Sequence, residues 1–218
     1  MKYNILSSFE NLPYFSIEAY RQIAKQDVRD DAHGRIALSR WVKAGHLIAL
    51  KKGVYMHRRF YERYRQEVVF SGVVSAILLP QSYLSLEYVM QQHGVLTEIT
   101  YPITAVTLKN TRTITNSLGT FVYRHLKPIL YQGFQIGEAY GIPYAQASVA
   151  KAVFDYLYLR KLPANIIPAR YNLAEDLRLN LDGFTAAERE EFAGYVAFSE
   201  MVKMQQIMQN LEFHIWRH

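Results

Sequence analysis

The sequence contains no cysteine among its 218 residues. This absence excludes a disulfide-linked scaffold, a zinc site with thiolate ligands and a catalytic thiol, and it fits a reducing compartment. The chain also lacks any apolar run that approaches the roughly 18–20 residues needed to span a membrane. Its first 15 residues, MKYNILSSFENLPYF, contain no uninterrupted apolar segment typical of a signal peptide. We therefore expect a cytoplasmic protein without a membrane partner.

Common catalytic motifs are missing as well. The sequence has no Walker A loop, no G-x-G-x-x-G and no H-E-x-x-H, and its seven histidines are scattered along the chain. We therefore assign no catalytic residue, no metal ligand and no cofactor, and we expect that the protein is not an enzyme.

Positive charge is concentrated in the first third of the chain. Residues 1–65 contain 13 Lys and Arg against 6 Asp and Glu, a net charge of +7. Residues 66–218 contain 12 Lys and Arg against 13 Asp and Glu, a net charge of −1. A small basic part attached to a nearly neutral one indicates a polyanionic partner for the first part only.

The local pattern of residues 1–57 predicts three short helices followed by a basic hairpin. Apolar residues recur at helical spacing over 5–12, and Ser16 is a suitable N-cap for a second helix. A third helix is predicted from Asp30 or Asp31 to about Ala44, with Gly45 immediately after its end. The stretches HLIAL and VYM then flank a Lys-Lys-Gly turn, which is the pattern of a two-stranded hairpin.

This order of elements predicts a winged helix-turn-helix, a DNA-binding fold whose last helix enters the major groove. The inward face of the third helix should consist of Ile36, Leu38, Trp41 and Val42. We expect its outward face and the hairpin turn to contact duplex DNA through Arg35, Ser39, Arg40, Lys43, Lys51 and Lys52. Arginine can donate two hydrogen bonds to guanine, and lysine acts on phosphates mainly through its charge. Arg58 and Arg59, in a helical linker over 58–66, could add phosphate contacts.

Residues 67–218 predict a mixed α/β domain, so the expected fold class of the whole chain is α+β. Alternating β-branched and aromatic residues predict antiparallel strands, and the capping box Thr185-x-x-Glu188 begins a long C-terminal helix. Lys151 and Asp155 lie one helical turn apart. They could form a catalytic or phosphate-handling pair, but we favour a surface or half-buried ion pair that contributes little.

Several stretches resemble the AbiEi-type antitoxins, which are regulators of type IV toxin–antitoxin systems linked to abortive phage infection. LSRWVKAGHLIALKKGVY resembles the winged-helix end of that family. LLPQSYLSLEYVMQQHGVL, LGTFVYRHLKP and ASVAKAVFDYLYLR resemble its second-domain blocks, in the same order. The resemblance implies an autorepressor that binds inverted operator repeats. It also implies a functional partner, a nucleotidyltransferase-like toxin. The protein would oppose this toxin without forming a stable complex with it.

Two other classes of function remain open. The second domain could hold an effector pocket, which would make the protein a ligand-sensing winged-helix regulator. Alternatively, that domain could be an enzyme related to nucleases or nucleotidyltransferases, attached to a DNA-binding N-terminal domain. A pocket lined by convergent polar groups would favour ligand sensing over a purely structural domain.

Overall fold

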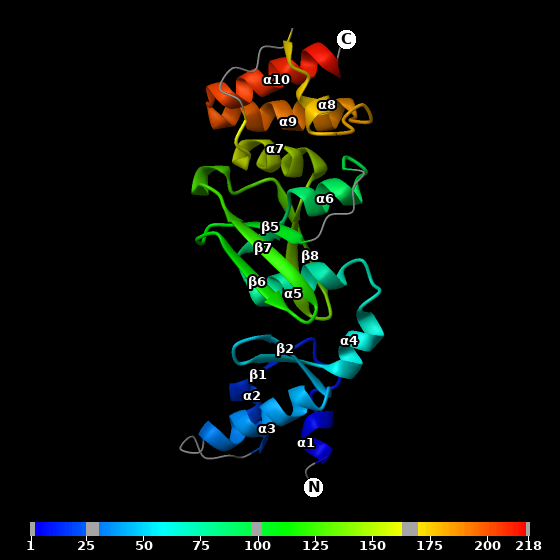
Figure 1. Cartoon of the computed structure of the whole chain (residues 1–218), viewed down its shortest axis with the longest axis vertical. Coiled ribbons are helices and arrows are strands. Elements are labelled where there is room, and N and C mark those ends of the chain that lie inside the picture. The colour runs from blue at the N-terminus through cyan, green and yellow to red at the C-terminus, as the bar shows by residue number, and fades with distance from the viewer. Residues whose placement is uncertain (1–2, 25–30, 97–101, 163–169, 217–218) are drawn as a thin grey trace. The chain divides into compact units, whose positions relative to one another are not determined.

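A computed structural model describes residues 3–24, 31–96, 102–162 and 170–216 (Figure 1). The chain is a mixed α/β protein, as the sequence predicts at this level. It forms two compact units. Unit 1 comprises residues 1–80, 113–120 and 138–144, and unit 2 comprises residues 81–112, 121–137 and 145–218. The predicted division into a domain over 1–57, a linker over 58–66 and a second domain over 67–218 stays a prediction.

Unit 1 begins with three helices and a small antiparallel sheet. The elements are α1 (Tyr3–Ser7), β1 (Phe15–Ser16), α2 (Ile17–Ala24), α3 (Asp31–Lys43), β2 (Leu47–Lys51) and β3 (Val54–His57). The strand order is β1-β3-β2, so β3 is the central strand. The predicted helix over 5–12 is shorter than expected, and the two-residue strand β1 is an addition that the sequence pattern did not indicate.

Local capping explains where α2 and α3 begin and end. The Ser16 hydroxyl accepts a hydrogen bond from the Ala19 amide at 3.2 Å, so Ser16 is the predicted N-cap of α2. After α3, the chain turns at Gly45 with a φ of 77°. The His46 amide donates to the Trp41 carbonyl at 2.9 Å, and the Gly45 amide donates to the Val42 carbonyl at 3.0 Å. These two bonds form a Schellman motif and confirm the predicted end of the third helix.

Two further helices of unit 1 follow the hairpin. They are α4 (Arg58–Tyr64), which makes the predicted linker helical, and α5 (Phe70–Leu78). The Lys51 ammonium donates to the Ile77 carbonyl at 2.7 Å and to the Leu78 carbonyl at 2.8 Å. The last carbonyls of a helix lack partners within the helix, so Lys51 satisfies two of them.

Unit 2 contains most of a six-stranded sheet. The strands are β4 (Ser82–Leu84), β5 (Ile103–Thr107), β6 (Arg112–Asn116), β7 (Gly119–His125), β8 (Phe134–Ala139) and β9 (Ile142–Ala147). Their order is β6-β7-β5-β4-β9-β8. Strand β4 pairs antiparallel with β5, whereas the β4–β9 and β5–β7 pairs are parallel. The sheet therefore contains the predicted antiparallel pairing, and it also contains parallel pairs that the sequence pattern did not indicate.

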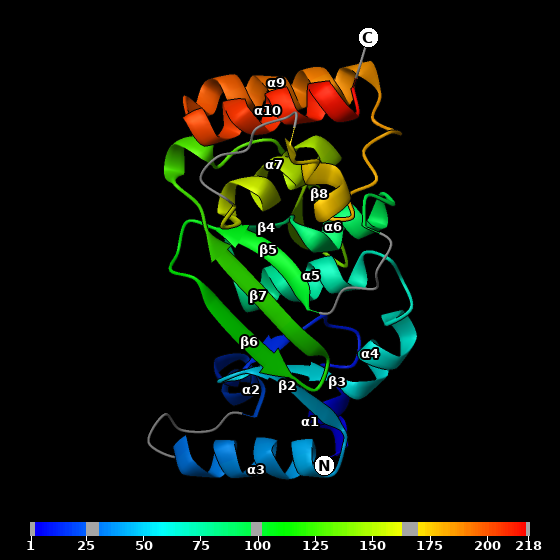
Figure 2. The ribbon, with the colours of Figure 1, turned by 45° about the horizontal axis from the view of Figure 1, so that its top comes forward.

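Helices cover this part of the sheet in successive layers. They are α6 (Glu87–Gln92), α7 (Val149–Leu159), α8 (Leu173–Asp176), α9 (Ala186–Ser199) and α10 (Val202–His214). Figures 1 and 2 show α7 next to the strands and α9 and α10 side by side beyond it. The core of unit 2 runs through these layers and includes Phe154, Phe192, Leu211 and Trp216, each at most 2% exposed. None of the helices in the described part of the chain is both long enough and apolar enough to cross a membrane.

The predicted long C-terminal helix is two helices. The capping box is present, because the Thr185 side chain accepts from the Glu188 amide and the Glu188 side chain accepts from the Thr185 amide. The helix ends at Glu200, whose φ of 52° is left-handed. This break allows Met204 and Leu211 of α10 to be buried in the same core as Phe192 of α9. A single straight helix of this length could not fold back on that core.

We expect Lys51 to stabilise the fold through α5. Replacing Lys51 by Met should lower the free energy of unfolding by about 1–2 kcal/mol, because two helix-terminal carbonyls lose a charged donor. The matched control is Lys52→Met, which removes the same charge from the exposed neighbouring residue. Urea denaturation followed by circular dichroism measures both changes. Equal stability of the two variants would contradict the assigned role of Lys51.

Candidate functional site

The outward face of α3 carries the cations predicted to contact DNA. Arg35, Ser39, Arg40 and Lys43 are all exposed, and Leu38 on the opposite face is fully buried. With 3.6 residues per turn, these four exposed residues lie within one broad stripe along the helix. The structure thus places the predicted α3 residues on one solvent-facing surface.

The inward face of α3 was assigned incorrectly at one position. Ile36 is 47% exposed, whereas Trp41 and Val42 are half-buried against the core of unit 1. Ile36 is one residue beyond Arg35 and four before Arg40, so helical geometry places it within the cationic stripe. The apolar side chain of Ile36 suggested that it is buried. Its angular position on α3 instead places it on the exposed face.

The two hairpin lysines have different environments. Lys51 is the last residue of β2, and its ammonium is bound to the end of α5. Lys52 lies in the turn between β2 and β3, and it is exposed. The sequence pattern treated both as free cations of one turn. Of these two lysines, only Lys52 has an ammonium that is exposed in the turn.

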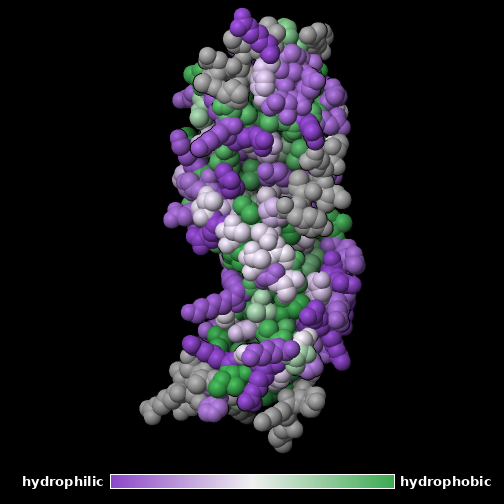
Figure 3. Space-filling view, in the orientation of Figure 1, coloured by the Kyte–Doolittle hydropathy of each residue, from purple (hydrophilic) through white to green (hydrophobic). Residues whose placement is uncertain are grey.

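The predicted accessory arginines are engaged within unit 1. The Arg58 Nε donates to the Gly45 carbonyl at 3.2 Å, next to the end of α3. The Arg59 guanidinium donates to Glu10 Oε1 at 2.7 Å, and this bond lowers the pKa of the Glu10 carboxyl. The Arg59 side chain is nevertheless 68% exposed, so this ion pair contributes little to stability. Hydrophilic side chains gather over α4 in Figure 3.

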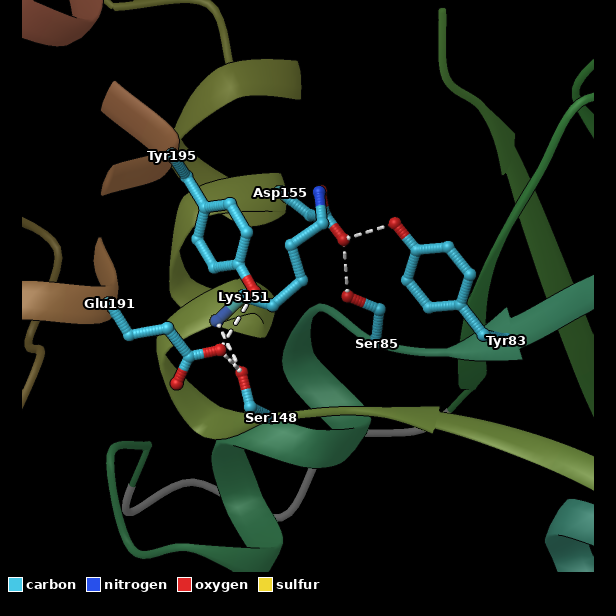
Figure 4. A network of polar contacts seen from close by, with 7 residues as sticks. All are labelled: Tyr83, Ser85, Ser148, Lys151, Asp155, Glu191 and Tyr195. Carbon is cyan, nitrogen blue, oxygen red and sulfur yellow. Dashed lines mark hydrogen bonds and ion pairs between the residues drawn. The ribbon is translucent and has the colours of Figure 1, made fainter. Parts of the chain in front are cut away.

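A cluster of polar side chains lies inside unit 2, around Lys151 and Asp155 of α7 (Figure 4). The Lys151 ammonium contacts Asp155 Oδ1 at 2.5 Å, and both residues are 0% exposed. The second carboxylate oxygen accepts hydrogen bonds from the Tyr83 and Ser85 hydroxyls, each at 2.8 Å. The favoured interpretation of a surface or half-buried ion pair was therefore wrong, because both residues lie inside unit 2 with no exposure to solvent.

Aromatic rings surround the Lys151 ammonium. It lies 4.8 Å from the centroid of the Phe154 ring, 5.3 Å from that of Tyr195 and 6.0 Å from that of Tyr83. Such ring faces attract a cation that has lost its water. Gly133 closes this site, because a Cβ atom there would lie 2.2 Å from the Tyr195 hydroxyl. No residue with a side chain fits at position 133 without displacing Tyr195.

Burial dominates the electrostatics of this cluster. It raises the pKa of the Asp155 carboxyl and lowers the pKa of the Lys151 ammonium, and the attraction between the two groups opposes both shifts. Burial also raises the pKa of the Tyr83 hydroxyl, with a further contribution from the Asp155 carboxylate. Tyr83 therefore keeps its proton and acts as a hydrogen-bond donor to Asp155.

A second set of hydrogen bonds connects α7 to α9. Glu191 Oε1 accepts from the Ser148 hydroxyl at 2.6 Å and from the Tyr195 hydroxyl at 2.7 Å. The Ser148 hydroxyl also accepts from the Lys151 amide at 3.0 Å, which makes Ser148 the N-cap of α7. The polar cluster thus reaches from β4 through α7 to α9.

The geometry of this cluster favours a structural role. Each oxygen of Asp155 is already bonded, and a substrate has no access to a fully buried pair. Sequence reasoning found Lys151 and Asp155 by their spacing but missed Tyr83 and Ser85, which are about seventy residues away in the chain. Within the described residues, no group of three or more His, Cys, Asp or Glu side chains could hold a metal ion.

Comparisons with known proteins leave the geometry as the main guide to function. No family model matches the sequence, and no curated protein matches it significantly.

We expect the buried pair to be strongly coupled. Asp155→Asn or Lys151→Met alone should lower the free energy of unfolding by about 3–5 kcal/mol, because each leaves one buried charge without its partner. The double variant should lose less than the sum of the two single changes. Urea denaturation of all three variants measures the coupling.

The exposed pair of Arg59 and Glu10 provides the matched control. Its double-mutant cycle should give a coupling of about 1 kcal/mol or less. If Asp155→Asn does not fold, Tyr83→Phe removes a single donor and should cost about 1–2 kcal/mol. A fully stable Asp155→Asn variant would show that the ion pair does not stabilise unit 2.

Proposed function

We propose that the protein is a DNA-binding transcriptional regulator whose first 57 residues form a winged helix-turn-helix. The order α1-β1-α2-α3-β2-β3 and the strand order β1-β3-β2 support this assignment. In such a fold the last helix enters the major groove and the hairpin lies beside it. The basic excess of residues 1–65 supports a polyanionic partner for the same part of the chain.

The observation that carries the proposal is the exposed stripe on α3. This helix has 13 residues, and at 1.5 Å per residue it is about 20 Å long. The major groove is about 12 Å wide and accepts one helix. Arg40 and Lys43 make no side-chain hydrogen bond or ion pair with other residues that the structure describes, so both are available for DNA.

Ile36 adds an apolar group to the same surface. It lies between cationic side chains on the outward face of α3 and is 47% exposed. An apolar side chain in the major groove can contact the methyl group of thymine, which distinguishes thymine from cytosine. We therefore include Ile36 with Arg35, Ser39 and Arg40 among the residues proposed to contact base edges.

The resemblance to AbiEi-type antitoxins extends the proposal to a specific biological role. We propose that the protein represses its own operon and opposes a nucleotidyltransferase-like toxin encoded by a neighbouring gene. Unit 2 is then the antitoxin part. Repression and antitoxin activity are separate claims, and each needs its own test.

The DNA-binding proposal predicts two kinds of variant. Replacing Arg35 or Arg40 by Ala should cost about 1–3 kcal/mol on a duplex from the protein's own promoter and much less on random DNA. Lys52→Ala should weaken binding to both duplexes alike. It should also make the slope of log K against log salt shallower, by about the amount expected for the loss of one phosphate contact. Fluorescence anisotropy titrations at two salt concentrations measure both effects.

Two controls make this test specific. Lys127→Ala removes an exposed cation of unit 2 and should leave DNA binding unchanged. Circular dichroism should show that each variant is folded, because arginine stems can also pack on the protein surface. If the folded Arg35→Ala/Arg40→Ala protein discriminates between the two duplexes as wild type does, α3 is not the reading helix.

The antitoxin role predicts rescue of growth. Expression of the neighbouring toxin gene alone should arrest growth of the host cells, and co-expression of this protein should restore it. The Arg35→Ala/Arg40→Ala variant should rescue as well as wild type, because it leaves unit 2 unchanged. Colony counts measure the rescue. A toxin that remains fully active beside this protein would contradict the antitoxin proposal while leaving DNA binding intact.

A further inference from the structure

A cleft with a volume of about 550 Å³ lies in unit 2, and Lys151 and Asp155 are not among the residues that line it. It is lined by residues of α6, β5 and β7 and by the C-terminal end of α7. Small-molecule sites in proteins have volumes of roughly 300–1,000 Å³. The size of this cleft therefore suits a ligand as large as a nucleotide.

Three cationic side chains line the cleft, together with one carboxylate. Arg124 lies on β7, Arg160 and Lys161 follow α7, and Glu87 is the first residue of α6. Side chains alternate along a strand, so Arg124 shares one face of β7 with Val122, while the neighbouring Tyr123 is fully buried. The formal charge of these four side chains is +2, which favours an anion.

Two of these cations have no role in the fold. Arg124 and Lys161 are exposed, and neither makes a hydrogen bond or ion pair with another residue in the described part of the chain. The end of α7 is capped by a different residue. The Lys203 ammonium donates to the Tyr158 carbonyl at 2.8 Å and to the Arg160 carbonyl at 2.7 Å. Arg160 and Lys161 are thus not required to neutralise the helix end.

Tyr156 fixes one of the three cations in place. The Arg160 guanidinium donates to the Tyr156 hydroxyl at 2.7 Å and lies 5.2 Å from the centroid of the Tyr156 ring. A guanidinium held in this way can still donate its remaining N–H groups to a phosphate. The cleft therefore contains one oriented cation and two more adaptable ones.

The apolar part of the lining includes a strained residue. Leu86 is 4% exposed and has a φ of 60° with a ψ of −143°, a conformation that residues other than glycine rarely adopt. Leu159 and Val122 supply further apolar surface. A leucine kept at this strained position provides an apolar wall that glycine would not provide.

We propose that this cleft binds a nucleoside phosphate. Arg124, Arg160 and Lys161 would hold the phosphates, since guanidinium and ammonium groups are the usual donors to phosphate oxygens. The Glu87 carboxylate would accept hydrogen bonds from the ribose hydroxyls, and Leu86 and Leu159 would contact the base. The site lies within unit 2 and does not depend on the proposed DNA binding.

Isothermal titration calorimetry of the full chain tests this site with ADP, GDP, CDP and UDP. At least one of these nucleotides should bind. Its affinity should be at least tenfold higher than that of pyrophosphate and at least tenfold higher than that of the corresponding nucleoside. Arg124→Ala and Arg160→Ala should each weaken that binding at least tenfold, and Arg124→Lys should weaken it less than Arg124→Ala. Glu87→Gln should weaken binding of the nucleotide but not of pyrophosphate.

Lys127→Ala is the matched control, because it removes an exposed cation of unit 2 outside the cleft. Its affinity for the nucleotide should equal that of wild type. The proposal is wrong if the folded protein binds none of the four nucleotides at millimolar concentration. It is also wrong if pyrophosphate binds as tightly as the nucleotide, or if Lys127→Ala weakens binding as much as Arg124→Ala. These titrations contain no DNA, so their failure and a failure of DNA binding are separate results.

Discussion

The buried ion pair of Lys151 and Asp155 is the interaction around which unit 2 is built. Removing two charges from water costs several kcal/mol per ion, and the attraction between them offsets that cost only when further hydrogen bonds satisfy their remaining polar atoms. Tyr83 of β4 and Ser85, which follows that strand, supply them, while the aromatic rings near Lys151 replace part of its hydration. Many alternative packings of the apolar core would leave these charges without partners. The pair therefore fixes how α7 lies on the strand.

Among the cations of the described residues, two groups have different physical roles. Some are held by carbonyl groups at helix ends, as Lys51 is at α5 and Lys203 is at α7. Others, such as Arg40 and Arg124, are exposed and make no side-chain bond with residues that the structure describes. The first class stabilises the fold, and the second is available to anionic partners. Net charge alone does not separate these classes, because it counts every cation equally.

Features that depend on near neighbours in the chain could be predicted from the sequence. The N-cap at Ser16, the helix end at Gly45 and the capping box at Thr185 are examples, since each is decided within a few residues. The partners of Asp155 come from a distant strand, and sequence spacing carries no signal for them. The helix break at Glu200 was also missed, because neither glycine nor proline marks it. It follows from the packing of two helices on one core, which is a tertiary constraint.

The different bonding of two adjacent lysines has a consequence for how this sequence can diverge. Under the proposed DNA binding, Lys52 acts through the charge of its ammonium, which is exposed in the turn and which arginine could supply equally well. Lys51 is bound to two carbonyls of α5, so any descendant that keeps this helix end needs a cation of similar reach there. Relatives that keep this helix end should therefore accept arginine at position 52 and retain lysine at position 51. The more invariant of the two lysines would be the one that does not touch DNA.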